Sequence, residues 1–459
     1  MSTIPEQLIA LLGQESVLTG ENIQPSYITD WSETPGVKPC AVVRPCSTED
    51  IQKTLRFCSE HQIPVVPQGG HTGLAGGATV TSPQSIVIST ERMNKIEHLD
   101  ENAATIQVQA GVILESINQA TQRHDLILGV DFGARGSCHI GGTIATNAGG
   151  NAVIQFGTMR EQVLGLEAVL ADGTVLPMLY PMLKNNTGYD LKQLFIGSEG
   201  TLGIITRAIL RLRPAPKVKA TAIFALPDYS SALRIFAMLQ SRFPGCLSAF
   251  ELMWQSFWDW SMAHMEVSNP FDDTYALYAL VEVDGQNSDI IQTQLEELME
   301  SALEKELLLD ATIAQSKAQA MSLWKIREAP TEFYAYMKPP INFDVSIPLS
   351  RIDDFVQSCN QAIAQRWPGH LTVCFGHVGD GNLHISTDGQ TVDGDEKGVE
   401  EIVYRIVSDY AGSSSAEHGI GLHKKPYLGT TRSIQEIQAM KSIKQALDPL
   451  NIMNPGKIF

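Results

Sequence analysis

Three glycine-rich segments, at 67–77, 133–150 and 197–205, constrain the fold of this chain more than any other feature. The first follows the apolar run Ile63–Val66, which predicts a strand ending in a loop of exposed backbone N–H groups. Small residues at nearly every position of the second permit close approach by a large flat ligand. Neither GxGxxG opening a helix nor GxxxxGK(S/T) occurs, so neither a Rossmann fold nor a P-loop is predicted. The three segments together favour an extended dinucleotide such as FAD over a simple phosphate.

Two histidines, His377 and His384, flank the dipeptide Asp380-Gly381. Asp-Gly between apolar strand residues predicts a two-residue hairpin turn of the primed type. Such a turn would place the two histidines directly opposite each other, with Cβ atoms roughly 4.5–5.5 Å apart. Two imidazoles so placed can bind one metal ion, and Glu417 adds a carboxylate further along the chain. The residues alone leave a metal site and an ordinary polar pair equally open; Zn²⁺ is the first guess, with Mn²⁺ or Fe²⁺ also compatible.

The prolines of Pro214-Ala215-Pro216 mark a boundary, because proline stops both helices and ladders. Beyond them, hydrophobic periodicity predicts strand, helix, strand, strand, helix and strand, an order typical of a ferredoxin-like α+β unit. We therefore expect an α+β chain in three parts. These are a glycine-rich domain at 1–215, a substrate or cap domain at 216–411, and a C-terminal segment at 412–459 that returns to the first domain.

Composition narrows the classes of function. The net charge of −18, from 33 Lys and Arg against 51 Asp and Glu, opposes binding to nucleic acid. Seven scattered cysteines without a CxxC pair indicate reduced thiols rather than a disulfide framework. No apolar stretch approaches the roughly 20 residues of a spanning helix, and the N-terminal run lacks the basic start of a signal peptide. We expect a cytoplasmic protein; peripheral membrane attachment and a homodimer stay open.

Six motifs together resemble a known flavoprotein family. The glycine-rich segments resemble the flavin domain of the vanillyl-alcohol oxidase and p-cresol methylhydroxylase (PCMH) superfamily. The runs GHVGDGNLH at 376–384, AEHGIG at 416–421 and NPGK at 454–457 are similar to its D-2-hydroxyacid dehydrogenase branch. The resemblance covers residues from about 35 to 459. It implies a PCMH-type FAD-binding domain of two α/β subdomains, a ferredoxin-like α+β cap domain and a C-terminal helical segment.

The resemblance also implies roles for single residues. FAD would be held by the glycine-rich segments and the tail, through Pro67, Gln68, Gly69, Gly70, His71, Thr72, Gly73, Leu74, Gly136, Ser137, Gly141, Gly142, Thr143, Ala145, Thr146, Asn147, Gly149, Gly150, Glu199, Gly200, Ile204, Ile205 and Asn454. A divalent metal, Zn²⁺ first, would be bound by His377, His384 and Glu417, with His418 as the general base. Arg327 and Thr331 match positions that hold the substrate carboxylate; further substrate-binding candidates are Lys338, Asn342 and Asn382.

The implied activity is oxidation of a D-2-hydroxy acid to the 2-oxo acid, with hydride transfer to flavin N5. D-lactate and D-2-hydroxyglutarate are the leading substrates, and the electrons would pass to an acceptor such as an electron-transfer flavoprotein or a quinone. Two further functions stay open: a metal-dependent hydrolase that uses the His/His/Glu site without flavin, and a flavoprotein electron-transfer subunit.

Three positions depart from the branch. Asn342 stands where the relatives commonly carry a lysine, and Ser386 where the D-2-hydroxyglutarate enzymes carry an asparagine. The missing cation weakens the case for a second carboxylate on the substrate. His71 stands where the branch usually has asparagine, which opens covalent FAD attachment as an alternative to the non-covalent cofactor that we expect.

Overall fold

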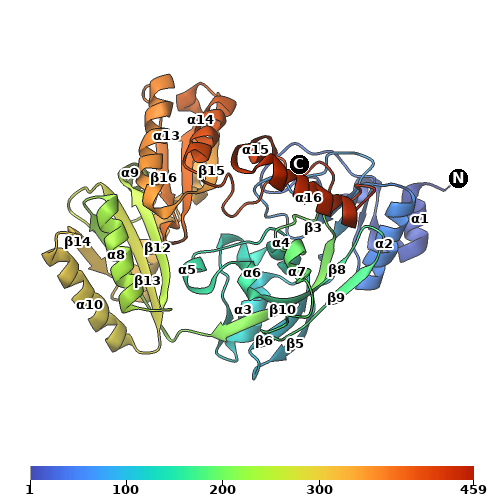
Figure 1. The fold of residues 1–459 in the computed structure, drawn as a ribbon, viewed down its shortest axis with the longest axis horizontal. Coiled ribbons are helices and arrows are strands. Elements are labelled where there is room, and N and C mark those ends of the chain that lie inside the picture. Colours follow the sequence, from blue (N-terminus) through green and yellow to red (C-terminus); the bar gives the residue numbers. More distant parts are fainter. Residues whose placement is uncertain (1) are drawn as a thin grey trace. The chain divides into compact units, whose positions relative to one another are not determined.

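The computed structural model describes residues 2–459, which form two compact units (Figure 1). The first unit consists of residues 2–150, Phe156–Ala215 and Glu417–Phe459, and the second of Asn151–Gln155 and Pro216–Ala416. The short helix α5 (Val153–Phe156) spans the crossing between them along the chain. The C-terminal 43 residues, from Glu417 onward, therefore belong to the same unit as the glycine-rich segments.

A four-stranded sheet of order β1-β2-β4-β3 forms one part of the first unit. Its strands are β1 (Val17–Leu18), β2 (Ala41–Val43), β3 (Val65–Gln68) and β4 (Ile86–Ser89), and β4 pairs in parallel with β2 and β3. Helix α1 (Ile4–Leu12) begins with a capping box at Thr3, and α2 (Thr48–Glu60) is capped by Ser47. The buried face of α2 follows helical spacing through Ile51, Leu55 and Cys58.

A second, antiparallel sheet forms the rest of that unit, with order β5-β6-β10-β8-β9 and β7 paired to β10. Its strands are β5 (Ile96–Asp100), β6 (Thr105–Gln109), β7 (Leu126–Leu128), β8 (Val163–Val169), β9 (Val175–Met178) and the long β10 (Ile204–Pro214). The helices of this part are α3 (Leu114–Gln122), α4 (Ile140–Ala145), α6 (Met159–Gln162) and α7 (Lys192–Phe195). Two sheets, each with its own buried apolar cluster, confirm the expected division of this unit into two subdomains.

One seven-stranded sheet of order β14-β11-β13-β12-β16-β17-β15 organises the second unit. Its strands are β11 (Val218–Leu226), β12 (Leu247–Trp254), β13 (Leu277–Gly285), β14 (Asp310–Ile313), β15 (Pro340–Ser346), β16 (Thr372–Gly376) and β17 (Asn382–Asp388). The first four strands lie in the order 4-1-3-2 of their sequence positions, which is the ferredoxin-like arrangement. The expected ferredoxin-like unit is therefore confirmed, and three further strands extend its sheet at β12.

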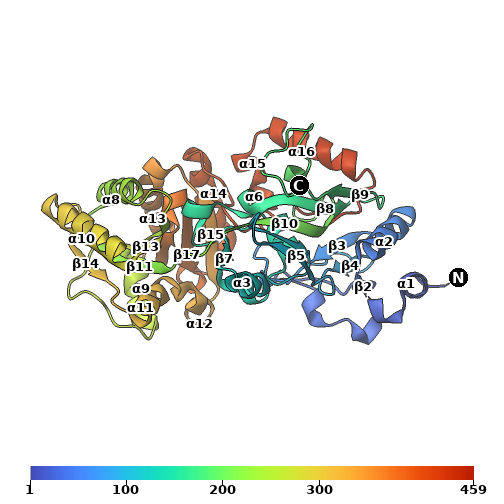
Figure 2. The same cartoon turned by 90° about the horizontal axis from the view of Figure 1, so that it is seen from below.

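Helices cover both faces of this sheet, as Figure 2 shows. On one face lie α8 (Tyr229–Arg242), α10 (Ser288–Glu304), α13 (Ile352–Arg366) and α14 (Glu396–Asp409). On the other lie α9 (Gln255–His264), α11 (Lys317–Arg327) and α12 (Phe333–Tyr336). The aromatic residues of α9 pack with α11 and α12 into a single apolar cluster, so α11 is held firmly against the sheet.

The C-terminal segment forms α15 (Leu428–Thr431) and α16 (Ile434–Leu447), and Ser433 caps α16 with a capping box. Within residues 2–459 no helix combines the length and the apolar character needed to cross a membrane. All seven cysteines are free thiols, as their spacing predicted.

Candidate functional site

The first two glycine-rich segments touch each other at Gly69 and Gly70, where a side chain would fit tightly or not at all. A Cβ atom on Gly70 would lie 2.0 Å from the carbonyl oxygen of Ser137, and one on Gly69 would lie 3.3 Å from Cβ of His139. The loop after β3 therefore rests directly on the backbone that leads into α4. This contact holds the backbone N–H groups of two separate segments side by side.

Of the seven buried polar side-chain atoms in this unit that lack a hydrogen-bond partner among the described residues, four lie on the predicted FAD-binding segments and the tail. The four are Oε1 of Gln68, Nδ1 of His71, Nδ1 of His139 and Oδ1 of Asn454. Burial lowers the pKa of both histidines, so their rings are neutral at physiological pH. A buried polar group without a partner costs about 1–3 kcal/mol. Their gathering on the predicted FAD-binding segments fits a polar cofactor that supplies the missing partners.

Helix α4 presents two consecutive glycines to different surroundings. A Cβ atom on Gly141 would lie 2.8 Å from Cβ of Ala110, so this glycine packs on the sheet. A Cβ atom on Gly142 would meet no atom within 4 Å. The hydroxyls of Thr143 and Thr146 donate to carbonyls of the same helix. The open face of α4 is therefore backbone at Gly142, the surface that a flat ligand can approach most closely.

Glu199 holds the C-terminal segment in place. Its Oε1 accepts the N–H of Ile420 at 2.8 Å and its Oε2 accepts the N–H of Gly421 at 2.7 Å. Burial raises the pKa of this carboxyl group. Asn454 Nδ2 donates to the carbonyl of Glu199 at 2.8 Å. Glu199, predicted only to line the cofactor, thus also anchors the segment that carries His418.

The other predicted FAD-binding residues lie on the same surfaces. Gly200 has φ +70, and its Cβ position is 3.0 Å from Cγ of Pro67, so the third glycine-rich segment packs against the first. Ile204 and Ile205 are buried at the start of β10. Asn147 has φ +52, and its Oδ1 accepts the N–H of Arg160. Several of the remaining residues are exposed or half-buried, among them Thr72, Gly73, Leu74, Gly136, Ser137 and Ala145.

The predicted hairpin between the two histidines has a different register. Strand β16 ends at Gly376, a 3₁₀ turn follows at Val378–Asp380, and Gly381 with φ +85 leads into β17. His384 therefore pairs with Phe375, and the prediction that it lies directly opposite His377 is wrong. The register differs by two residues, and strand side chains alternate with a period of two, so both histidines still share a face. Their ring centroids are 5.6 Å apart.

A buried carboxylate, Glu251 on β12, joins two of the predicted site residues. Its Oε1 accepts from Nδ1 of His377 at 2.6 Å, and its Oε2 accepts from Nε of Arg327 at 2.8 Å. Burial alone would raise the pKa of Glu251, but the charges of His377 and Arg327 lower it to about 2. The Arg327 guanidinium also lies over the ring of Phe375, 4.6 Å from its centroid.

Among the other substrate-binding candidates, Asn382 is buried and the rest are exposed. Asn382 Nδ2 donates to Asp344 at 3.3 Å, and its Oδ1 has no partner among the described residues. Asn342 lies opposite Ser386 on the paired strands and accepts its hydroxyl hydrogen bond at 2.7 Å. Two of the three positions that depart from the branch, Asn342 and Ser386, are therefore direct neighbours.

Thr331 and Lys338 flank the short helix α12 and are both exposed. The hydroxyl of Thr331 donates to the carbonyl of Glu328 at 2.9 Å, and the backbone N–H of Lys338 donates to Asp388 at 3.1 Å. Their side chains keep access to solvent, so their role toward a substrate stays a prediction.

Glu417 and His418 open the segment of the first unit that directly follows Ala416, the last residue of the second. Two residues before Glu417, Ser415 donates its hydroxyl to Asp344 at 3.2 Å. Asp344 in turn pairs with His384 in the ladder between β15 and β17. The residues just before the predicted metal ligand are thus hydrogen-bonded to the edge strand that carries Asp344.

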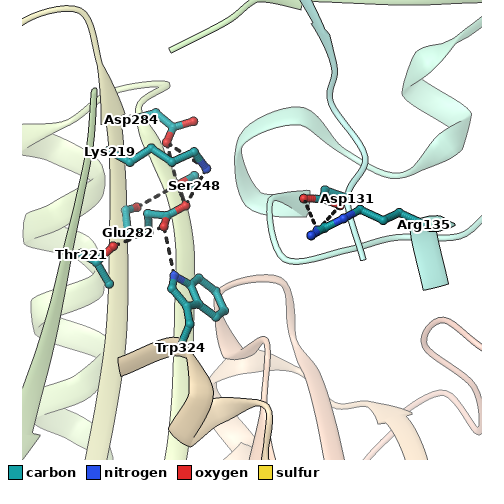
Figure 3. Close-up of polar contacts among 8 residues, drawn as sticks. All are labelled: Asp131, Arg135, Lys219, Thr221, Ser248, Glu282, Asp284 and Trp324. Atoms are coloured by element: carbon teal, nitrogen blue, oxygen red, sulfur yellow. Dashed lines mark hydrogen bonds and ion pairs between the residues drawn. The ribbon is translucent and has the colours of Figure 1, made fainter. Parts of the chain in front are cut away.

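A second buried carboxylate cluster supports the helix that carries Arg327 (Figure 3). Glu282 on β13 accepts the indole N–H of Trp324 at 3.0 Å, and Trp324 lies one helical turn before Arg327 on α11. The remaining partners of Glu282 are Lys219, Thr221 and Ser248, and the neighbouring carboxylate is Asp284. The same figure shows Arg135, beside Gly136 in the first unit, donating to Asp131 at 3.0 Å.

Sequence reasoning missed Glu251. It lies 126 residues from His377 and 76 residues from Arg327 along the chain, so no local spacing connects it to either. A charged residue inside the apolar run Leu247–Trp254 is the one signal that could have drawn attention to it, because an unpaired charge is rarely buried.

Comparison with known families gives two matches that together span most of the chain. Residues 39–178 match the profile of the FAD binding domain, and residues 215–458 match that of the FAD linked oxidases, C-terminal domain. The first match contains two of the glycine-rich segments, and the second contains Glu251, Arg327 and both histidines of the candidate metal site.

Similar proteins cover nearly the whole chain. Mitochondrial D-2-hydroxyglutarate dehydrogenase of Danio rerio is 37% identical over 441 residues, 96% of this chain and 82% of the relative. D-2-hydroxyglutarate dehydrogenase of Xanthomonas citri pv. viticola is 39% identical, over 94% of this chain and 92% of the relative. A mitochondrial protein of Schizosaccharomyces pombe with the provisional name D-lactate dehydrogenase is 38% identical, over 94% and 84%.

A solved structure has the same fold at low identity. Alkyldihydroxyacetonephosphate synthase superposes with a TM-score of 0.75 at 17% sequence identity, over 99% of this chain and 86% of that one. This likeness supports the architecture of both units.

Proposed function

The chain belongs to the FAD-linked oxidase family, in its D-2-hydroxyacid dehydrogenase branch, and from this premise we propose that it oxidises a D-2-hydroxy acid to the 2-oxo acid. The observation that carries the proposal is Arg327, a buried guanidinium fixed between Glu251 and Phe375 in the second unit. D-2-hydroxyglutarate is the first candidate substrate, because relatives that match nearly the full chain are named for it.

The first unit would hold the cofactor. The backbone of loop 67–74, the open face of α4 at Gly142, and the unpartnered atoms of Gln68, His71 and Asn454 support non-covalent FAD. When bound, FAD supplies the acceptor for the hydride that leaves C2 of the substrate. Glu199 positions the segment of His418 through two backbone N–H groups.

The second unit would bind the substrate carboxylate. Nε of Arg327 donates to Glu251, which leaves its Nη edge to form a bidentate pair with the substrate. The unpartnered Oδ1 of Asn382 offers an acceptor for a substrate hydroxyl group. His418 would take the proton of the C2 hydroxyl, because imidazole accepts protons near neutral pH.

A divalent metal ion, with Zn²⁺ as the first candidate, would be held by His377, His384 and Glu417. Support comes from the 5.6 Å between the two imidazole rings and from the chain that fixes Ser415 two residues before Glu417. Two residues of extended chain span at most about 7 Å. When bound, such an ion lowers the pKa of the substrate hydroxyl group.

The size of the substrate depends on charge near Asn342. A second carboxylate, as in D-2-hydroxyglutarate, needs a second cation, and the structure offers Lys338 as an exposed candidate from the same strand-entry region. D-lactate has one carboxylate and makes no such demand. It is the second candidate, favoured by the neutral Asn342–Ser386 pair. A flavin-free hydrolase disagrees with the matched FAD binding domain.

The proposal is tested by an anaerobic panel of D-2-hydroxy acids, scored by bleaching of the flavin absorbance with Zn²⁺ present. We expect D-2-hydroxyglutarate or D-lactate to bleach wild type. We expect Arg327→Ala to need a substrate concentration at least about 100-fold higher, since a lost charge-assisted anchor costs about 3 kcal/mol. Arg207→Ala is the matched control, because Arg207 pairs with a buried glutamate in the first unit. If no hydroxy acid bleaches wild type, the proposal is wrong and an electron-transfer flavoprotein is favoured instead.

A further inference from the structure

We propose that Glu251 is a positioning residue that couples His377 to Arg327, so that metal binding raises the affinity for the substrate carboxylate. The inference rests on the proposed function and adds a residue that no family resemblance pointed to. It is carried by the geometry of one buried carboxylate between two functional side chains.

Each oxygen of Glu251 has one cationic or potentially cationic partner. Oε1 is 2.6 Å from Nδ1 of His377, and Oε2 is 2.8 Å from Nε of Arg327. The Glu251 side chain is 1% exposed, and those of Arg327 and His377 are 10% and 11% exposed. Little water reaches the three groups, so their charges act on one another with weak screening.

The contact with Glu251 sets the tautomer of His377. An ionised carboxylate only accepts hydrogen bonds, so Nδ1 of His377 must carry the hydrogen. The lone pair is then on Nε2, the form in which imidazole ligates a metal ion. A carboxylate that accepts from the other ring nitrogen is the usual support of a metal-ligating histidine, and it raises the basicity of the ligand.

The same carboxylate sets the orientation of Arg327. Its Nε faces Glu251 and its guanidinium plane lies over Phe375, which leaves the Nη edge as the surface for a ligand carboxylate. The negative charge of Glu251 partly neutralises this edge. A metal ion on His377 would draw that charge toward the imidazole, and Arg327 would then attract an anion more strongly. Because coupling between two binding sites is reciprocal, a bound carboxylate must strengthen metal binding by the same factor.

The test uses Glu251→Gln in the flavin-loaded full-length protein, with two probes that need no turnover. An amide has one acceptor oxygen, so it satisfies either His377 or Arg327 but not both. Zn²⁺ affinity is measured by competition with a chelator. Carboxylate affinity is measured by calorimetry with propionate, which lacks the 2-hydroxyl group. Wild type is expected to bind propionate about fivefold more tightly when saturated with Zn²⁺.

In Glu251→Gln we expect Zn²⁺ affinity to fall by about 10- to 100-fold, and propionate affinity to become independent of Zn²⁺. Glu167→Gln is the matched control, because Glu167 is a buried carboxylate that accepts from Nε and Nη2 of Arg207 in the first unit. It should retain wild-type Zn²⁺ affinity and wild-type coupling. Unchanged coupling in Glu251→Gln, or no coupling in wild type, overturns the proposal.

Arg327→Gln keeps the proposal testable if Glu251→Gln does not fold. With the guanidinium removed, the charge of Glu251 acts on His377 alone, so Zn²⁺ should bind severalfold more tightly than in wild type. Unchanged or weaker Zn²⁺ binding contradicts the coupling. These outcomes are separate from the fate of the proposed function. If Zn²⁺ and propionate binding are coupled but no hydroxy acid bleaches the flavin, the proposed activity is wrong and the role of Glu251 stands.

Discussion

Gly142 on α4 offers a direct test of where the cofactor lies. Alanine at this position would place a Cβ atom with no protein atom within 4 Å, so the apoprotein has room for it. The same substitution at Gly70 would place Cβ 2.0 Å from the backbone oxygen of Ser137, where something must move. Substitution of Gly142 should therefore affect only the space for the cofactor, whereas substitution of Gly70 should disturb the packing of the protein itself.

In the apoprotein, Gly142→Ala and Gly70→Ala should change the free energy of unfolding in opposite directions. Gly142 lies inside a helix, where alanine is more stable than glycine by about 1 kcal/mol, because glycine loses more backbone entropy. This corresponds to a Tm higher by about 2–4 °C for a unit of this size. Gly70→Ala should destabilise by about 1–3 kcal/mol or more, as overpacking does. If FAD packs on the open face of α4, a methyl group there should weaken FAD binding by about fivefold to 100-fold.

The assay compares apoprotein Tm by circular dichroism with FAD affinity by fluorescence titration. Gly142→Ala should raise or keep the Tm and lose FAD affinity, whereas Gly70→Ala should lose both. Wild-type FAD affinity in a well-folded Gly142→Ala protein would refute the placement of the cofactor against this face.

Three further predictions concern other residues. Glu199→Gln should lower kcat, because one backbone N–H of the segment that carries His418 loses its acceptor. Thermal unfolding should show an accompanying loss of stability of about 1–3 kcal/mol. An unchanged kcat would mean that Glu199 does not position His418. Burial lowers the pKa of Lys457 to about 8 from the ordinary 10.5, so the unfolded state binds more protons between these values. The free energy of unfolding should therefore rise by up to about 3 kcal/mol from pH 8 to 10.5, and urea titrations of Lys457→Met should lack this rise. Acid precipitation of the protein should leave all flavin in the supernatant, as expected for non-covalent FAD. Flavin that stays in the pellet of wild type, and moves to the supernatant in His71→Asn, would instead establish a covalent link through His71.

The ferredoxin-like half of the second unit could be predicted because its signals are local. Each strand and helix from Val218 to Ile313 has its own hydrophobic period, and the order of elements restricts the sheet to few topologies. Strand β10 was not predicted, because its start, Ile204–Thr206, continues a glycine-rich run that reads as loop.

The candidate site was predictable only where its members are close in sequence. That His377 and His384 share a face follows from the alternation of side chains along a strand. This prediction is correct although the predicted register is wrong. The error came from treating Asp380-Gly381 as the whole turn, whereas Val378–Asp380 forms a 3₁₀ turn that adds two residues. The role of Glu251 depends on β12 lying beside β16, a pairing between segments more than 100 residues apart that no local pattern encodes.

The seven-stranded sheet has two parts, β14-β11-β13-β12 and β16-β17-β15, and the joint where β12 pairs with β16 has a consequence for hydrogen exchange. The ladder from β12 to β16 contains the pairs Leu252↔Gly376 and Met253↔Phe375, whereas β11 and β13 pair along their whole length. Amides at a short ladder open with a lower local free energy than those inside a long one. Glu251 reaches across this joint to His377 and adds a side-chain link beside the short ladder. Deuterium uptake at 252–253 and 375–376 would then report ligand binding directly, as slower local opening in an enzyme that is not turning over.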